Sequence, residues 1–110
     1  MLCKKSLIIS VRADSQVIFE FLCSKDNILG DYKFLAADDK LLKIFLKGKV
    51  NWLSWGEKIT IEIKSIADEN TNIIISSEPS VPITLIDWGR NQQNVDKIAH
   101  YIYTAFPRAV

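Results

Sequence analysis

The sequence predicts a single α+β domain whose elements follow the order strand, helix, four strands, helix. Apolar and polar residues alternate in several runs before residue 80, which is the period of strands with one buried face. Apolar residues also recur at helical spacing directly after residue 14 and near the carboxyl end. An antiparallel sheet with both helices packed on one face is the economical arrangement for this order. With 110 residues, 48% of them apolar, the range 1–110 is expected to form one core without disulfide or metal support.

The first strand is predicted over residues 6–12, because Leu7, Ile9 and Val11 fall on one face. Asp14 and Ser15 then supply a helix start, since short polar side chains accept hydrogen bonds from the amides of a first turn. One amphipathic helix is expected over residues 14–29, ending at Gly30. Its apolar residues at helical spacing are Val17, Ile18, Phe21, Leu22, Ile28 and Leu29.

Strand periodicity returns after Gly30. Residues 32–37 and 41–47 flank the polar turn Asp38-Asp39-Lys40 and are predicted to form a hairpin, with Leu42, Ile44 and Leu46 on one face. Gly48 marks a bend or bulge. Residues 57–66 form the clearest strand, with Ile59, Ile61 and Ile63 facing inward. Residues 72–77 are expected to pair back on it, and Pro79 and Pro82 end that strand.

The last element is a helix that Pro107 closes. Its predicted buried stripe consists of Val95, Ile98, Ala99, Ile102 and Phe106. Trp88 lies seven residues before Val95, so it would extend the same stripe and pin the helix to the sheet. Either Asp87 or Asn91 is expected to be the N-cap. The segment from Asp87 to Val95 is therefore interpreted first as a structural connection.

Composition restricts the classes of function. The formal charge of +1, from 14 basic and 13 acidic residues, gives no field that would gather nucleic acid or an anionic membrane. The sequence contains no apolar stretch of about 20 residues that could span a membrane. The expectation is a soluble cytoplasmic protein in which Cys3 and Cys23 are reduced thiols. The four scattered glycines form no phosphate-binding loop, and no cofactor or metal is expected.

Candidate functional residues each have a structural interpretation beside the functional one. His100 and Asp96 are one helical turn apart and could pair, although a surface pair is favoured over a catalytic dyad. Asp87 could be an acid–base group if it were buried, but a capping role is favoured. The amides that follow it, together with Arg90, could hold an anion, a site that the Asp87 carboxylate would oppose.

Two further groups of residues are candidates for binding. Trp52, Trp55 and Trp88 could line an apolar pocket between the sheet and the last helix, or they could simply be core. Asn91 and Asn94 could be exposed hydrogen-bonding groups for a partner, although helix capping and solvated faces explain them as well. We expect no catalytic residue or metal ligand among these candidates.

The second half of the chain carries a signature. Residues 54–59 read Ser-Trp-Gly-Glu-Lys-Ile, and they are followed by Ser76-Ser77, Pro82, and Ile86-Asp87-Trp88-Gly89-Arg90-Asn91 through Asn94-Val95. This pattern resembles a group of small bacterial proteins with a similar SWGE…DWGKN..N signature. Over residues 5–106 the order of elements resembles the TATA-binding-protein-like architecture, whose core the helix-grip (START-like) lipid-transfer proteins share. The resemblance implies the fold and supplies no catalytic residues.

The chain also departs from those architectures. Helix-grip proteins that enclose a lipid are longer, with an extra helix and strands that widen the cavity. A DNA-binding saddle of the TATA-binding kind needs two repeats and a basic, phenylalanine-bearing concave face. This chain has one copy and a charge of +1.

The leading hypothesis is a small, non-enzymatic binding or interaction module that engages a protein partner or a second copy of itself. The second is a carrier of a small apolar ligand between the sheet and the C-terminal helix. The third is an enzyme that uses Asp87 or His100 as its acid–base group.

Overall fold

The computed structural model describes residues 4–24, 32–48, 56–79 and 90–109. Along the chain the elements are β1 (Lys5–Val11), α1 (Ser15–Cys23), β2 (Lys33–Asp38), β3 (Lys43–Lys47), β4 (Glu57–Ala67), β5 (Asn70–Pro79) and α2 (Arg90–Ala105). The predicted β-α-β4-α order of an α+β fold is confirmed.

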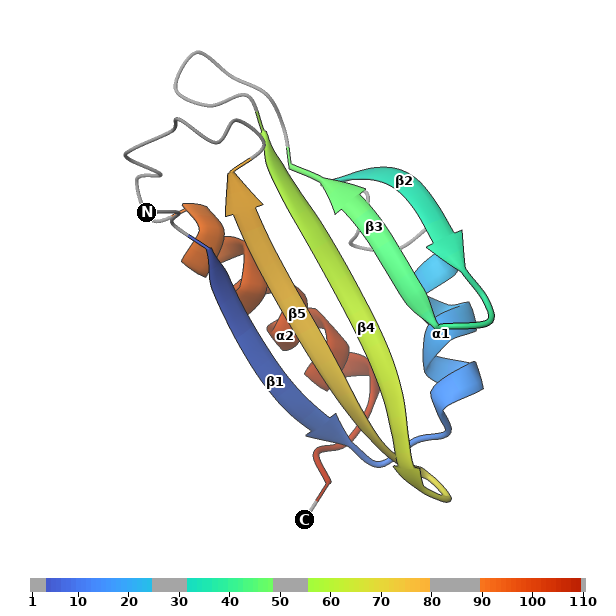
Figure 1. The fold of residues 1–110 in the computed structure, drawn as a ribbon. Helices are drawn as coiled ribbons and strands as arrows, with labels where there is room; N and C mark the ends of the chain where they lie inside the picture. The colour runs from blue at the N-terminus through green and yellow to red at the C-terminus, as the bar shows by residue number, and fades with distance from the viewer. Residues whose placement is uncertain (1–3, 25–31, 49–55, 80–89, 110) are drawn as a thin grey trace.

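The five strands form one antiparallel sheet in the order β1-β5-β4-β3-β2. Its register aligns Leu7, Ile75, Ile61 and Ile44 in one row across four neighbouring strands. Paired residues point to the same face, so the row forms a continuous apolar strip. Both helices lie on one side of the sheet, with α2 against β1 and β5 and α1 against β4 (Figure 1).

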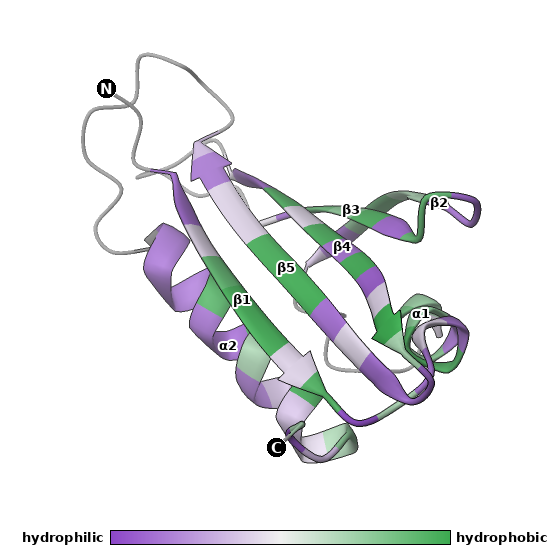
Figure 2. Ribbon diagram, turned by 60° about the horizontal axis from the view of Figure 1, so that its bottom comes forward, coloured by the Kyte–Doolittle hydropathy of each residue, from purple (hydrophilic) through white to green (hydrophobic). Residues whose placement is uncertain are grey.

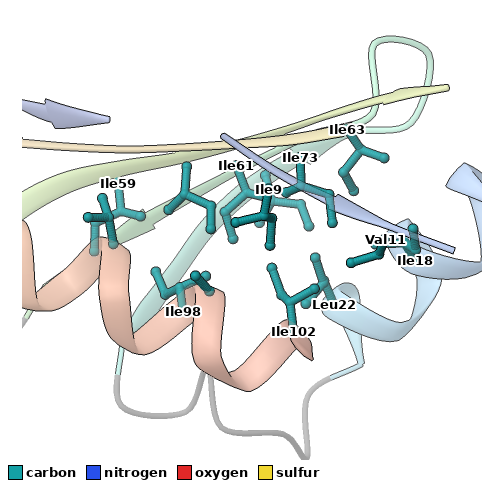
Figure 3. Close-up of a cluster of buried hydrophobic side chains, with 14 of the residues drawn as sticks. Ile9, Val11, Ile18, Leu22, Ile59, Ile61, Ile63, Ile73, Ile98 and Ile102 are labelled. Atoms are coloured by element: carbon teal, nitrogen blue, oxygen red, sulfur yellow. The ribbon is translucent and has the colours of Figure 1, made fainter. Parts of the chain in front are cut away.

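The core lies between the sheet and the two helices. Alternate residues of the central strands are buried there, as the prediction for Ile59, Ile61 and Ile63 required. Helix α2 contributes the predicted stripe to this core. Val95, Ile98, Ala99 and Ile102 are buried, and Phe106 packs at the margin of the core. Figure 3 shows Ile98 and Ile102 pointing from α2 toward the sheet. In Figure 2 apolar and polar positions alternate along β4, whereas the middle of β5 is continuously apolar.

Helix α1 is shorter than the sequence predicted. Asp14 is its N-cap, as expected, and accepts hydrogen bonds from the amides of Gln16 (3.0 Å) and Val17 (3.3 Å). The helix ends at Cys23 because Ser24 takes an extended conformation, and the polar run that follows offers no apolar residue to continue the buried stripe. Val17 is 54% exposed, so its place in the predicted stripe is wrong. Ile28, Leu29 and Gly30 lie outside the described residues.

The hairpin between β2 and β3 has a wider turn than predicted. Asp38 accepts hydrogen bonds from the amides of Lys40 (2.9 Å) and Leu41 (3.0 Å), and the turn spans residues 39–42, one residue more than predicted. Leu42 has a φ of 54° and leaves the strand to which the sequence assigned it. Its carbonyl accepts a hydrogen bond from the amide of Ile63 (3.0 Å), so the residue still joins the turn to β4. A bulge between Phe34 and Ala36 interrupts the pairing of β2 with β3.

The described helices include none that is long and apolar enough to cross a membrane.

The alternation along β5 gives a direct test of which face is the core. Ile75 is 0% exposed and faces the helices, whereas Ile74 beside it faces the opposite side of the sheet. We expect Ile75→Ala to lower the free energy of unfolding by about 2–5 kcal/mol, because the truncation leaves a cavity. Ile74→Ala should cost about 1 kcal/mol or less. Urea denaturation of both variants makes the comparison, and equal losses would contradict the assigned face.

Candidate functional site

A buried polar cluster stands at the end of the core where β4 and α2 begin. Its members are Tyr32, Glu57, Ser77, Asn91 and Asn94, and all except the half-buried Tyr32 are buried. The strand order places β4 and β5 side by side, so the first residue of β4 lies near the end of β5. On α2 the two asparagines are three positions apart and therefore share one face of the helix.

Asn94 joins the members of this cluster. Its amide nitrogen donates to Glu57 Oε1 at 2.9 Å and to Ser77 Oγ at 3.1 Å. Its amide oxygen accepts a hydrogen bond from the Tyr32 hydroxyl at 3.2 Å. Ser77 in turn donates to Asn91 Oδ1 at 2.7 Å. The cluster thus connects β4, β5, α2 and the residue before β2, and it fixes the start of α2 over the sheet.

Glu57 is the charged member and is 2% exposed. Its carboxylate lies directly over Gly48, where a β-carbon would collide with Oε1. The amide of Gly48 also donates to the Glu57 carbonyl at 2.9 Å. Gly48 was predicted as a bend or bulge, and a β-carbon at this position would require the Glu57 side chain to shift. Burying a carboxylate is costly unless hydrogen-bond donors surround it, which makes Glu57 the most chemically distinctive side chain of the cluster.

The cluster gathers several hydrogen-bond acceptors. Its oxygens include a carboxylate, two amide carbonyls and two hydroxyls within one small volume next to apolar side chains. The Lys97 ammonium lies 5.8 Å from the centre of the Tyr32 ring and brings one positive charge to its margin. Such an arrangement suits recognition of a polar group on an otherwise apolar ligand.

The structure corrects the expectations for the two asparagines. Both were considered exposed, partner-binding or capping groups, and both are buried and turned toward the sheet. Asn91 as the N-cap is wrong: α2 begins at Arg90, so Asn91 lies inside the helix, and its Oδ1 accepts a hydrogen bond from the Ser77 hydroxyl. Sequence reasoning missed Tyr32, Glu57 and Ser77 as site residues. The signature was the available signal, because its glutamate, serine and two asparagines are four of the five members.

Several predicted site residues are not among those that the structure describes. Trp52, Trp55, Asp87 and Trp88 lie outside the described residues, and so does the side chain of Arg90. The tryptophan-lined pocket, the capping role of Asp87 and the anion site therefore stay predictions.

The remaining candidates show neither an acid–base pair nor a metal-binding cluster among the described residues. His100 is exposed on α2, and Asp96 accepts a hydrogen bond from Gln92 Nε2 at 3.0 Å, with no bond between Asp96 and His100 in the described residues. The Cys23 thiol is free, and burial raises its pKa, which makes it a poor nucleophile at neutral pH. Within the described parts of the chain, no three of the histidine, cysteine and acidic side chains gather as metal ligands would.

Comparison with known proteins gives a structural likeness and no sequence family. No family model matches the sequence, and no curated protein matches it. The Zhui aromatase/cyclase from Streptomyces sp. R1128 superposes with a TM-score of 0.60 at 9% identity, over 96% of this chain and 88% of that one. A START superfamily protein from Mycobacterium smegmatis gives a TM-score of 0.57 at 11% identity, over 88% of this chain and 90% of that one. The helix-grip, START-like fold is therefore confirmed.

Two adjacent serines of β5 test the importance of the cluster. Ser77 is buried and bonded to both asparagines, whereas Ser76 points to the other face and bonds to the exposed Ser6 hydroxyl. We expect Ser77→Ala to cost about 1–3 kcal/mol of stability, because buried groups lose their partner. Ser76→Ala should change it by about 0.5 kcal/mol or less. Thermal and urea unfolding measure both, and a harmless Ser77→Ala would show that the cluster does not hold α2 in place.

Proposed function

We propose that this domain binds a small, mainly apolar ligand that carries a hydrogen-bonding group. The observation that carries the proposal is the position of the polar cluster at one end of the otherwise apolar layer between the sheet and the helices. Ligand sites in proteins commonly combine apolar walls with a few convergent polar groups. The polar group of the ligand would meet the cluster, and its apolar body would extend away from it.

The apolar body has a surface available on β2. Phe34 pairs with Leu46, which pairs with Ile59, so the three side chains share the helix side of the sheet. Leu46 and Ile59 are buried, but Phe34 is 48% exposed although it faces the side that the helices cover. Tyr32, two residues before Phe34, reaches across to Asn94 on α2. An apolar ligand that covers Phe34 would therefore lie next to the polar cluster.

The negative charge of Glu57 would determine which polar group the ligand can carry. A ligand hydroxyl or amine can donate a hydrogen bond to the oxygens that surround Asn94, whereas a ligand carboxylate would stand against the buried carboxylate of Glu57. We therefore expect apolar alcohols, phenols and amines to bind and their carboxylate counterparts to be rejected.

The structural likeness supports a ligand-binding role. One similar structure is an aromatase/cyclase and the other a START superfamily protein, and both cover most of this chain. The described residues offer acceptors and an apolar surface rather than a paired acid and base, so we propose binding and not catalysis. The leading hypothesis from sequence, a module that binds a protein partner or a second copy, would involve surfaces other than this ligand site.

Two phenylalanines on neighbouring strands provide a matched test. Phe34 and Phe45 are 48% and 36% exposed, but they face opposite sides of the sheet. We expect naphthol to bind the native protein, Phe34→Ala to raise the dissociation constant about tenfold (1.4 kcal/mol), and Phe45→Ala to leave it unchanged. Titration calorimetry gives the constants. The proposal would be overturned if both variants lost the same affinity for naphthol, or if the native protein bound neither naphthol nor naphthylamine.

The role of Glu57 predicts a change of selectivity. The native protein should bind naphthol in preference to naphthoate, since the buried carboxylate repels an anion. Glu57→Gln keeps the size of the side chain and an oxygen that Asn94 can bond. We expect this variant to bind naphthoate more tightly than the native protein does and so to lose much of its preference for naphthol. An unchanged ratio of the two dissociation constants would place the ligand away from the cluster.

A further inference from the structure

A second surface lies outside the proposed ligand site, along the edge of β1 that faces away from β5. There β1 and α2 border an open groove of about 450 Å³. Its β1 wall includes Leu7 and Ile9, and its α2 wall includes Asp96, Ala99, His100 and Tyr103. In Figure 2 the open side of β1 faces away from β5, with α2 running beneath it. The groove thus joins the edge of a sheet to the side of a helix.

The backbone of β1 has hydrogen-bonding groups directed toward this edge. The carbonyl of Ser10 accepts from the amide of Ala109 at 3.0 Å, and the amide of Arg12 donates to the carbonyl of Pro107 at 2.8 Å. Antiparallel strands direct alternate residues to opposite neighbours, so the backbone groups of Ser6 and Ile8 also point outward. Among the described residues, no strand pairs with this part of the edge.

A short segment of the chain already pairs with one end of this edge. Residues 107–109 run antiparallel to β1, with a bridge between Val11 and Arg108. This pairing covers the carboxyl end of β1, and no other described segment pairs with the edge beside the groove. A further segment laid along Ile8 and Ser6 would extend the same ladder without any change in the sheet.

We propose that the β1 edge and the α2 groove bind an extended segment of a protein partner by strand addition. Alternate side chains of that segment would enter the groove beside Leu7, Ala99 and Tyr103, and the others would lie next to Ile8, which is 64% exposed. Lys4 and Lys5 are exposed where this edge begins. The segment therefore has apolar residues at alternate positions and an acidic residue at the end beside the lysines.

A second copy of β1 fits this edge less well than a short segment of another protein. Symmetric antiparallel pairing centred on Leu7 would bring Lys4 opposite Ser10 of the second copy. The Ser10 carbonyl already accepts from Ala109. A short segment of a partner avoids that position.

The test attaches a strand to the edge at high effective concentration. Appending Thr-Val-Thr-Val-Glu after Val110 continues the register of the bridge, so the first added residue faces Ile8 and the third faces Ser6. Hydrogen exchange by NMR should show the amides of Ser6 and Ile8 slowed about tenfold or more. The amides of Leu7 and Ile9, which point toward β5, serve as internal references and should not change.

The controls separate strand addition from a general effect of a longer chain. A Gly-Ser extension of equal length, or one with proline at the first and third added positions, should leave Ser6 and Ile8 exchanging as in the native protein. Replacing the final glutamate by lysine should weaken the protection. If the Thr-Val extension protects these two amides no better than the Gly-Ser one, the edge does not take a strand and the proposal fails. In the native protein, the Ser6 and Ile8 amides could instead exchange slowly in concentrated solution and fast on dilution. A second copy of the protein would then cover the edge, and the proposal would be overturned.

Discussion

The structure depends on the register between β4 and β5. Their pairing places Ile61 opposite Ile75 and Ile63 opposite Ile73, so that one face of the central hairpin is continuously apolar. Both helices owe their position to this face, because an amphipathic helix in water is held mainly by what its apolar side covers. A shift of β4 by one residue would turn its isoleucines to the other face and place Thr60, Glu62 and Lys64 against the helices.

The polar cluster follows from where that apolar face ends. The row formed by Ile59 and Ser77 is already half polar, and the next row brings Glu57 opposite Pro79. The first turns of α2 lie over these rows, and there the helix supplies two asparagines in place of aliphatic side chains. A buried carboxylate without hydrogen-bond donors would destabilise the fold. Because Asn94 on α2 donates to Glu57, this carboxylate instead fixes the position of the first turns of the helix. If the proposed ligand binds here, the same oxygens would serve both to place the helix and to recognise the ligand.

The sequence predicted the elements well and the site only partly. Periods of two and of 3.6 residues located the strands and the buried stripe of α2, because burial on one face imposes those periods directly. The end of α1 and the turn before β3 were wrong, since they depend on the backbone conformations of Ser24 and Leu42, which no periodicity records. Asn91 and Asn94 were identified as notable but assigned to the surface. Their burial depends on partners 14 and 37 residues away, Ser77 and Glu57, and such long-range pairing is invisible in a local pattern.

The two edges of the sheet differ in a way that bears on recognition. On β2 a bulge between Phe34 and Ala36 breaks the ladder, and Asp38 turns its side chain back onto the backbone of the following turn. Bulges of this kind protect an edge from adding another strand. On β1 the pairing with β5 is regular over all seven residues, and a short segment of the chain already occupies one end of the open side. The regular edge beside a groove is the one on which we propose that a peptide binds, while the bulged edge leaves Phe34 turned toward the helices, where the proposed apolar ligand would cover it.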